Sequence, residues 1–156
     1  MPPLAYHITW TTYGSWLPGD SRGWVEGGTP GIQTPDPERT DHSRDLMTGT
    51  SVTLTPAQRE IVEATIRDHC GIRKWPLLAL NIRTNHIHLI VTADVTPEIV
   101  MSQLKAWCSR RLSEHAGLIG RSRNGQRRWW TEHGSTKYIN DETYLQNAIQ
   151  YVNERQ

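Results

Sequence analysis

The first strand that the hydrophobic pattern predicts covers residues 4–13, where apolar residues alternate with polar ones. Such alternation gives the strand one apolar face and one polar face, and the polar face carries His7. Further strands are predicted over residues 75–83, 86–93 and 129–138. Only Thr84 and Asn85 separate the second strand from the third, so these two strands are expected to form an antiparallel hairpin.

Three further stretches have the apolar spacing of amphipathic helices. The first helix starts after Thr55, which forms a capping box with Gln58, and Gly71 is expected to end it. The second helix covers about residues 97–116, and the third runs from residue 141 or 142 to the end of the sequence. The apolar stripe of this last helix consists of Leu145, Ala148, Ile149 and Val152.

The order of these elements is β-α-β-β-α-β followed by a helix, which is the ferredoxin-like split pattern. We therefore predict a single α+β domain over residues 1–156, with two helices on one face of an antiparallel sheet and the last helix on the other. Residues 14–53 are rich in turn signals and form an irregular insertion. For residues 27–50 a functional loop and a disordered surface insertion both remain open.

The composition limits the class of protein. A length of 156 residues suits one domain, and a net charge of +1 means that any site for nucleic acid has to be a local one. Cys70 and Cys108 fall at apolar helix positions and are predicted to be reduced core residues. The sequence begins without a secretory signal pattern, and no apolar run approaches the roughly 20 residues of a membrane span. These features favour a soluble intracellular protein.

The most informative motif is Asn85-His86-Ile87-His88, at the start of the third predicted strand. His86 and His88 share one face of that strand, while Ile87 points to the opposite, core-facing side. Two imidazoles at neighbouring positions of a rigid strand can bind one metal ion. Because the pattern is short, two ordinary polar residues at a strand end remain an alternative.

A basic segment lies immediately before the fourth predicted strand. It contains four arginines followed by two tryptophans: Arg121, Arg123, Arg127, Arg128, Trp129 and Trp130. Cations beside aromatic rings suit single-stranded nucleic acid, with phosphates on the cations and bases on the rings. A solvated loop whose tryptophans anchor the core is the alternative. Lys105, on the polar side of the second helix, is a further candidate for DNA contact.

Tyr151 lies at the edge of the apolar stripe of the last helix, which is expected to pack on the sheet face that carries the two histidines. A tyrosine hydroxyl is a poor nucleophile near neutral pH because its pKa is about 10. It becomes useful where a divalent metal polarises the phosphate that it attacks. The combination suggests a phosphotyrosyl intermediate, with Tyr144 and Tyr138 as rival nucleophiles.

The Asn85-His86-Ile87-His88 segment resembles the HUH motif (histidine, hydrophobic residue, histidine) of the single-tyrosine transposases. These comprise the transposases of the insertion-sequence-200 type and the REP-associated tyrosine transposases. Residues 5–13 are similar to the first strand of that family, and residues 148–152 resemble the helix that carries its nucleophile. The order of elements agrees over most of the chain, and residues 14–53 are an insertion relative to the smallest members.

The resemblance implies an enzyme that nicks and joins single-stranded DNA in transposition. His86 and His88 would bind one Mg²⁺ or Mn²⁺, and Tyr151 would attack the scissile phosphate to give a 5′-phosphotyrosine and a free 3′-hydroxyl. It implies no ATP or other organic cofactor. Hairpin DNA is the implied partner, and both a monomer and a homodimer are compatible with the family. The implied location is the prokaryotic cytoplasm, in association with the nucleoid.

The chain departs from the family four positions after the tyrosine. The family commonly has a glutamine or asparagine there as a third metal ligand, whereas this chain has Arg155, which cannot bind a cation. Gln156 follows and lies about 140° from Tyr151 on an ideal helix, so it would reach the metal only from a frayed helix end. Asn147 and water are the other candidate ligands, and Arg155 could instead pair with a phosphate.

Arg155 leaves a second function open, a domesticated protein that binds hairpin DNA without cutting it. A histidine-triad hydrolase fits the sequence less well, because it needs a third histidine where Ile90 stands. His7 would lie near the site only if its polar face is the face of the histidine pair.

Overall fold

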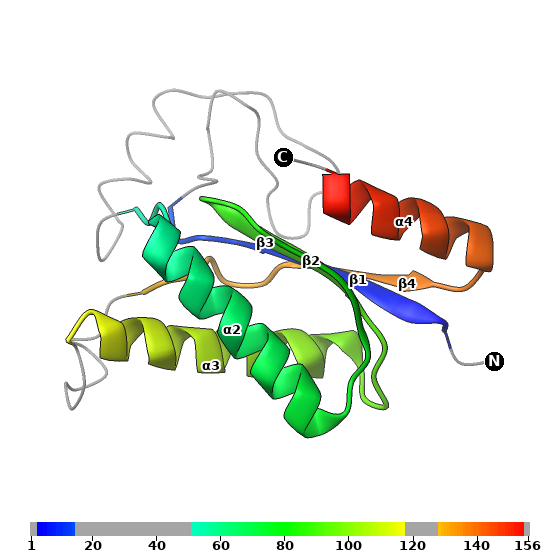
Figure 1. The fold of residues 1–156 in the computed structure, drawn as a ribbon, viewed down its shortest axis with the longest axis horizontal. Coiled ribbons are helices and arrows are strands. Elements are labelled where there is room, and N and C mark those ends of the chain that lie inside the picture. The colour runs from blue at the N-terminus through cyan, green and yellow to red at the C-terminus, as the bar shows by residue number, and fades with distance from the viewer. Residues whose placement is uncertain (1–2, 15–50, 118–127, 155–156) are drawn as a thin grey trace.

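A computed structural model describes residues 3–14, 51–117 and 128–154 of the chain. Within these ranges the elements follow the predicted order (Figure 1). The strands are β1 (Ala5–Thr11), β2 (Leu77–Ile82), β3 (His86–Val91) and β4 (Ser135–Ile139). The helices are α2 (Pro56–Arg73), α3 (Pro97–His115) and α4 (Glu142–Glu154). Most of the predicted insertion, residues 15–50, lies outside the described residues, so its predicted character stays a prediction.

The four strands form one antiparallel sheet in the order β2-β3-β1-β4. β1 and β3 are therefore the inner strands, and β2 and β4 are the edges. This mixed architecture confirms the predicted ferredoxin-like α+β class. The register pairs Thr9 with His88, and His7 with Lys137. Since paired residues point to the same face of a sheet, these four side chains share one face.

Helices cover both faces of the sheet, with α2 and α3 on one side and α4 on the other (Figure 1). The larger core lies under α2 and α3, where Cys70 and Cys108 are free and buried as predicted. The largest fully buried side chains of that core include Trp10, Trp129, Ile87, Leu89 and Leu104. Burial of each such aliphatic side chain stabilises the fold by roughly 1.5–3 kcal/mol. None of the helices in the described ranges is long and apolar enough to cross a membrane.

α2 begins as the sequence predicts and ends later than predicted. The hydroxyl of Thr55 accepts a hydrogen bond from the amide of Gln58, whose side chain accepts one from the amide of Thr55. The expected end at Gly71 is wrong, because the helix continues to Arg73. Lys74 then takes a left-handed conformation (φ 60°). The amide of buried Trp75 closes the turn on the carbonyl of Cys70 (2.9 Å).

The fourth strand begins later than predicted, at Ser135 rather than residue 129. Trp129 and Trp130 precede it as buried anchors, and Trp130 forms an isolated bridge with Thr12 of the chain after β1. Gly134 lies so close to the sheet that a Cβ atom built on it would stand 2.6 Å from the carbonyl oxygen of Thr9. Only a residue without a side chain fits this approach, and the regular strand starts directly after it.

Candidate active site

The sheet face that carries the two histidines is only partly covered by α4. The covered part is apolar and buries Leu145, Ala148 and Val152 of the helix against Ile90 and Ile139 of the sheet. Next to this contact is a cavity of about 460 Å³. Its walls come from β1, the β2–β3 turn, β3, β4 and α4, and include His7, Arg83, His86, His88, Lys137 and Tyr151.

The histidine pair and Tyr151 meet in this cavity. The ring centres of His86 and His88 are 5.3 Å apart, and the ring of Tyr151 stands edge-on to His88 at 6.0 Å. His7 from the neighbouring strand lies 6.3 Å from His88 and 6.3 Å from Tyr151, measured between ring centres. Tyr151 is about half exposed (48%) and is one of the residues that line the cavity. The structure thus joins the two motifs that the sequence places 63 residues apart, between positions 88 and 151.

A hydrogen bond fixes the orientation of the His86 ring, whereas one nitrogen atom in each of His7 and His88 has no hydrogen-bond partner. The Nδ1–H of His86 donates to Oδ1 of Asn85 (2.9 Å), which leaves Nε2 of His86 as the atom with a lone pair. Nε2 of His88 and Nε2 of His7 are buried and have no hydrogen-bond partner. Buried polar atoms of this kind are rare in folded proteins and are commonly explained by a ligand or ion.

The electrostatic environment keeps all three histidines neutral. Burial lowers the pKa of His88 to about 4, with further contributions from His86, His7 and Arg83. Burial followed by Arg83 lowers the pKa of His86, and burial followed by Lys137 lowers that of His7. A neutral imidazole is the form that binds a metal ion. The rings are therefore ready to bind a cation at neutral pH without first losing a proton.

The residues present fit a divalent cation that is bound by two imidazoles and completed by other ligands. Within the described residues there is no group of three or more His, Cys, Asp or Glu side chains that could hold a metal ion. His86 and His88 would thus provide two positions, and oxygen ligands from water and a substrate phosphate suit the remaining positions of Mg²⁺ or Mn²⁺. The predicted ligand Gln156 lies outside the described residues, and exposed Asn147 does not line the cavity.

Comparison with known proteins identifies the family of this chain. The family model described as "Transposase IS200 like" matches residues 50–155. This chain belongs to the IS200-like transposase family. The match includes the strand with both histidines and the helix with Tyr151. Among curated protein sequences, none matches this chain.

Two solved structures are similar to the IS200-like chain. One is a REP-associated tyrosine transposase bound to a REP hairpin, with a TM-score of 0.53 and 11% sequence identity. The match covers 97% of this chain and 66% of that one, so this chain spans just under two thirds of that protein. The likeness shows a shared fold. The other is the crystal structure of a candidate transposase from Deinococcus radiodurans, with a TM-score of 0.49, 16% identity and coverage of 99% and 95%.

Four site features of this family member were missed or undervalued by sequence reasoning. His7 received only a weak hypothesis, yet it lies in the cavity because β1 pairs directly with β3. The role of Asn85 in orienting His86 could have been expected from its position next to that histidine. Arg83 precedes the same turn, and Lys137 is the cross-strand partner of His7. Lys137 had no detectable signal, since its position depends on a register between distant strands.

Two of the predicted DNA contacts turn out to have structural roles. Lys105 is half-buried, and its ammonium donates to the carbonyls of Thr131 and His133, both at 2.9 Å. These bonds brace the segment before β4, and DNA contact by Lys105 stays a prediction. Trp129 is only 2% exposed, and its indole N–H donates to Ser113 (2.9 Å). The alternative of a core anchor therefore describes Trp129, whose ring is not open for stacking on a base.

The remaining predicted DNA contacts are arginines. Arg128 is exposed, and its guanidinium lies 5.3 Å from the ring centre of Tyr13, in a cation–π arrangement. The other four lie outside the described residues: Arg121, Arg123, Arg127 and Arg155.

The rival tyrosines lie away from the cavity. Tyr138 stands edge-on to Tyr6 at 5.5 Å, and Tyr6 belongs to the core on the opposite face of the sheet. Tyr144 is in the first turn of α4, where its amide donates to Asp141 (2.8 Å), and its side chain is not among those lining the cavity. Of these three tyrosines, only Tyr151 lies beside the histidine pair.

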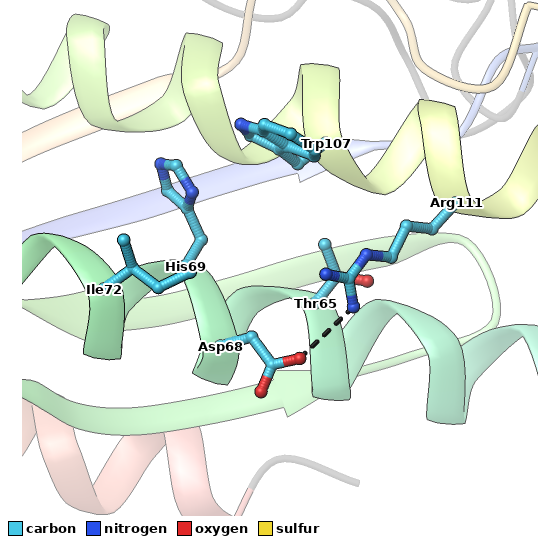
Figure 2. A pocket seen from close by; sticks show the side chains of 6 residues that line it. All are labelled: Thr65, Asp68, His69, Ile72, Trp107 and Arg111. Atoms are coloured by element: carbon cyan, nitrogen blue, oxygen red, sulfur yellow. Dashed lines mark hydrogen bonds and ion pairs between the residues drawn. The ribbon is translucent and has the colours of Figure 1, made fainter.

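A second, much smaller hollow of about 70 Å³ lies between α2 and α3, on the far side of the sheet (Figure 2). Figure 2 shows Arg111 of α3 reaching Asp68 of α2, with 3.2 Å between the charged atoms. His69 in the same hollow hydrogen-bonds to Gln103 (2.8 Å) and packs edge-on against Trp75. These pairs join the two helices, so the hollow is a feature of helix packing.

Proposed function

We propose that this chain is a metal-dependent enzyme that nicks and joins single-stranded DNA, with Tyr151 as the nucleophile. The observation that carries the proposal is the placement of Tyr151, 6.0 Å from His88 between ring centres, in a cavity that His86 also lines. Family membership supports it, because the residues matched by the transposase family include His86, His88 and Tyr151. The proposal concerns DNA transposition, for which nicking and rejoining are the chemical steps.

The chemistry is a transesterification. The phenolic oxygen of Tyr151 forms a bond to phosphorus, and the bond between phosphorus and the 3′-oxygen of the preceding nucleotide breaks. The products are a 5′-phosphotyrosine and a 3′-hydroxyl, and the phenolic proton is balanced by the proton that the 3′-oxygen gains. Attack by a DNA 3′-hydroxyl on the phosphotyrosine reverses the step and rejoins DNA, without any external source of energy.

His86 and His88 would hold the cation of this reaction, either Mg²⁺ or Mn²⁺. When bound, the cation would polarise the phosphate and offset the charge that develops during attack. The protein's own contribution is to keep both rings neutral and oriented, through burial and through the hydrogen bond from His86 to Asn85. It also fixes Tyr151 on a helix whose apolar stripe is packed on the same sheet.

A hairpin-bearing single strand is the proposed substrate. The structural relative described as a REP-associated tyrosine transposase is bound to a REP hairpin, and the shared fold supports a similar class of DNA for this chain. Arg128 is the described member of a proposed basic DNA-binding set that also includes Arg121, Arg123, Arg127 and Arg155. A net charge of +1 is compatible with such local contacts.

We also infer that Tyr151 works together with the histidine pair of its own chain, rather than with that of a second subunit. α4 packs on the sheet of the same chain and buries Leu145, Ala148 and Val152 there. The side-chain amide of Asn81 donates to the carbonyl of Val152 (2.9 Å), directly after the tyrosine. This arrangement supports a complete site in a monomer and does not require exchange of the helix in a dimer.

Covalent capture tests the nicking reaction. Hairpin oligonucleotides taken from the DNA that flanks the gene are labelled and incubated with the protein in Mn²⁺ or in EDTA, and products are separated on denaturing gels. The expected result is a metal-dependent protein–DNA adduct that disappears in Tyr151→Phe and in His86→Ala. Tyr144→Phe is the matched control, because it removes the same hydroxyl from the same helix outside the cavity.

Two outcomes would contradict the proposal. An adduct that persists in Tyr151→Phe and disappears in Tyr144→Phe or Tyr138→Phe would assign the nucleophile to another tyrosine. Tight hairpin binding without an adduct in any metal would favour the second function, a hairpin-DNA-binding protein that does not cut.

A further inference from the structure

Two basic side chains enter the cavity from opposite edges of the sheet. Arg83 directly follows β2, one edge strand, and its amide donates to the carbonyl of His86 (2.8 Å) to close the β2–β3 turn. Lys137 lies on β4, the other edge strand. Both residues line the same cavity as the histidine pair. Across the sheet the order is thus a cation, the metal-binding pair, His7 and a second cation.

The backbone fixes each cation beside a different histidine. The turn that Arg83 closes also carries His86, and the charge of Arg83 contributes to the lowered pKa values of both His86 and His88. Lys137 is the register partner of His7 and contributes to the lowered pKa of that ring. The two positive charges are therefore associated with histidines on different strands of the cavity wall.

Neither charge forms an ion pair with another described residue. Among the described residues the ion pairs are those of Arg67, Arg110 and Arg111, on α2 and α3, and none includes Arg83 or Lys137. Among the described residues that line the cavity there is no Asp or Glu. Two cations without an acidic partner in a concave site repel one another and the site attracts an anion. Lys105 provides the contrast, since its ammonium is satisfied by two carbonyl oxygens.

We propose that Arg83 and Lys137 are contacts for backbone phosphates and hold a single strand of DNA across the cavity, from one edge of the sheet to the other. The proposal rests on the proposed function for the identity of its partner. The distance between the two contacts follows from the sheet, because three strand spacings of roughly 4.8 Å separate the two edge strands. This span exceeds one nucleotide step, so the contacts bracket the phosphate that Tyr151 attacks rather than duplicating each other. They position DNA and are not catalytic residues.

The dependence of DNA binding on salt tests this inference without any cleavage. Binding of labelled oligothymidine, which forms no hairpin, is measured in EDTA at several salt concentrations. Each phosphate contact to a single strand contributes about 0.7 to the slope of log affinity against log salt. We expect Arg83→Gln and Lys137→Gln each to reduce the slope by about 0.7, and the double variant by about 1.4.

Matched variants separate a phosphate contact from a general effect of charge or folding. Arg73→Gln removes one exposed positive charge from the end of α2, away from the cavity, and should leave the slope unchanged. Lys137→Arg and Arg83→Lys keep the charge and should retain most of the slope. Thermal unfolding of each variant verifies that the fold is intact.

The outcomes distinguish this inference from the proposed function. Unchanged slopes in both glutamine variants, or a loss equal to that of Arg73→Gln, would overturn the inference even if the wild type forms a tyrosine adduct. Reduced slopes would support it even if no adduct is found. Absence of measurable binding by the wild type would overturn it as well.

Discussion

Asn81 connects the helix of the proposed nucleophile to the strand beside the histidine pair. Its side chain donates to the carbonyl of Val152 (2.9 Å), while its backbone is in register with His88. This hydrogen bond and the apolar contact of α4 thus both contribute to the position of Tyr151 relative to His88. This relationship makes it possible to disturb the approach of the tyrosine without touching either group.

The first prediction follows from that hydrogen bond. Asn81→Ala should slow formation of the tyrosine adduct at least tenfold, because displacement of a reacting group by about 1 Å can cost a hundredfold in rate. Mn²⁺ affinity should stay unchanged, since both histidines remain in place. The loss in the free energy of unfolding should be about 1 kcal/mol. Single-turnover kinetics, titration with Mn²⁺ and urea unfolding measure the three quantities.

Asn140→Ala is the control for Asn81→Ala, since Asn140 is exposed and does not line the cavity. Equal effects of the two substitutions on adduct formation would contradict the role of Asn81 in placing α4.

The second prediction concerns the orientation of His86. Asn85→Ala removes the acceptor for Nδ1–H of His86 and should weaken Mn²⁺ binding by about 10- to 100-fold. Isothermal titration measures the affinity. Asn147→Ala should leave it unchanged, because Asn147 lies outside the cavity. A loss of affinity in Asn147→Ala alone would instead identify that residue as the missing ligand.

The third prediction concerns stability in acid. The pKa of His88 is about 4 in the folded protein and about 6.5 in a free side chain. Between these values the unfolded chain binds the proton and the folded chain does not, so stability is fully present above pH 6.5 and falls as the pH drops towards 4. The slope for one such group is at most about 1.4 kcal/mol per pH unit.

Urea unfolding in EDTA between pH 7.5 and 4.5 measures this loss. His88→Gln keeps a polar side chain of similar size but cannot titrate, so this variant should lose less stability over the same range. Equal losses in the two proteins would show that His88 is not the titrating group.

The fourth prediction tests whether the site is complete in one chain. Mixing His88→Ala with Tyr151→Phe should not restore adduct formation, because each chain packs α4 on its own sheet and lacks one half of the site. Recovery of activity towards a quarter to a half of the wild-type level would show exchange of the helix between subunits. Mixtures of each variant with the wild type are the controls.

Much of the fold could be predicted because its signals are local. The capping box at Thr55, the short connection at Thr84 and Asn85, and the apolar stripe of α4 each depend on residues close together in sequence. Errors arose where tertiary contacts decide the outcome. Gly71 stays helical because burial of Trp75 favours a later end, a contact that the local pattern does not reveal.

The candidate site was predictable to the same extent. The histidine pair has the period of a strand, and Tyr151 has a fixed phase relative to the apolar stripe of its helix. Lys137 escaped notice because only the pairing of β4 with β1 brings it beside His7. The hydrogen bonds of Lys105 could not be predicted, because they depend on carbonyls of a segment distant in sequence.

The packing of α4 also limits which insertions this helix can accept without moving Tyr151. Leu145, Ala148 and Val152 fix the rotation of α4 on the sheet, and Tyr151 takes its direction from that rotation. Adding one residue between Ala148 and Tyr151 would turn the phenol by about 100° and aim it away from the cavity. The tyrosine and the apolar stripe therefore have to keep the same relative positions around the helix. A helix from another protein could replace α4 only if it carried both at this spacing.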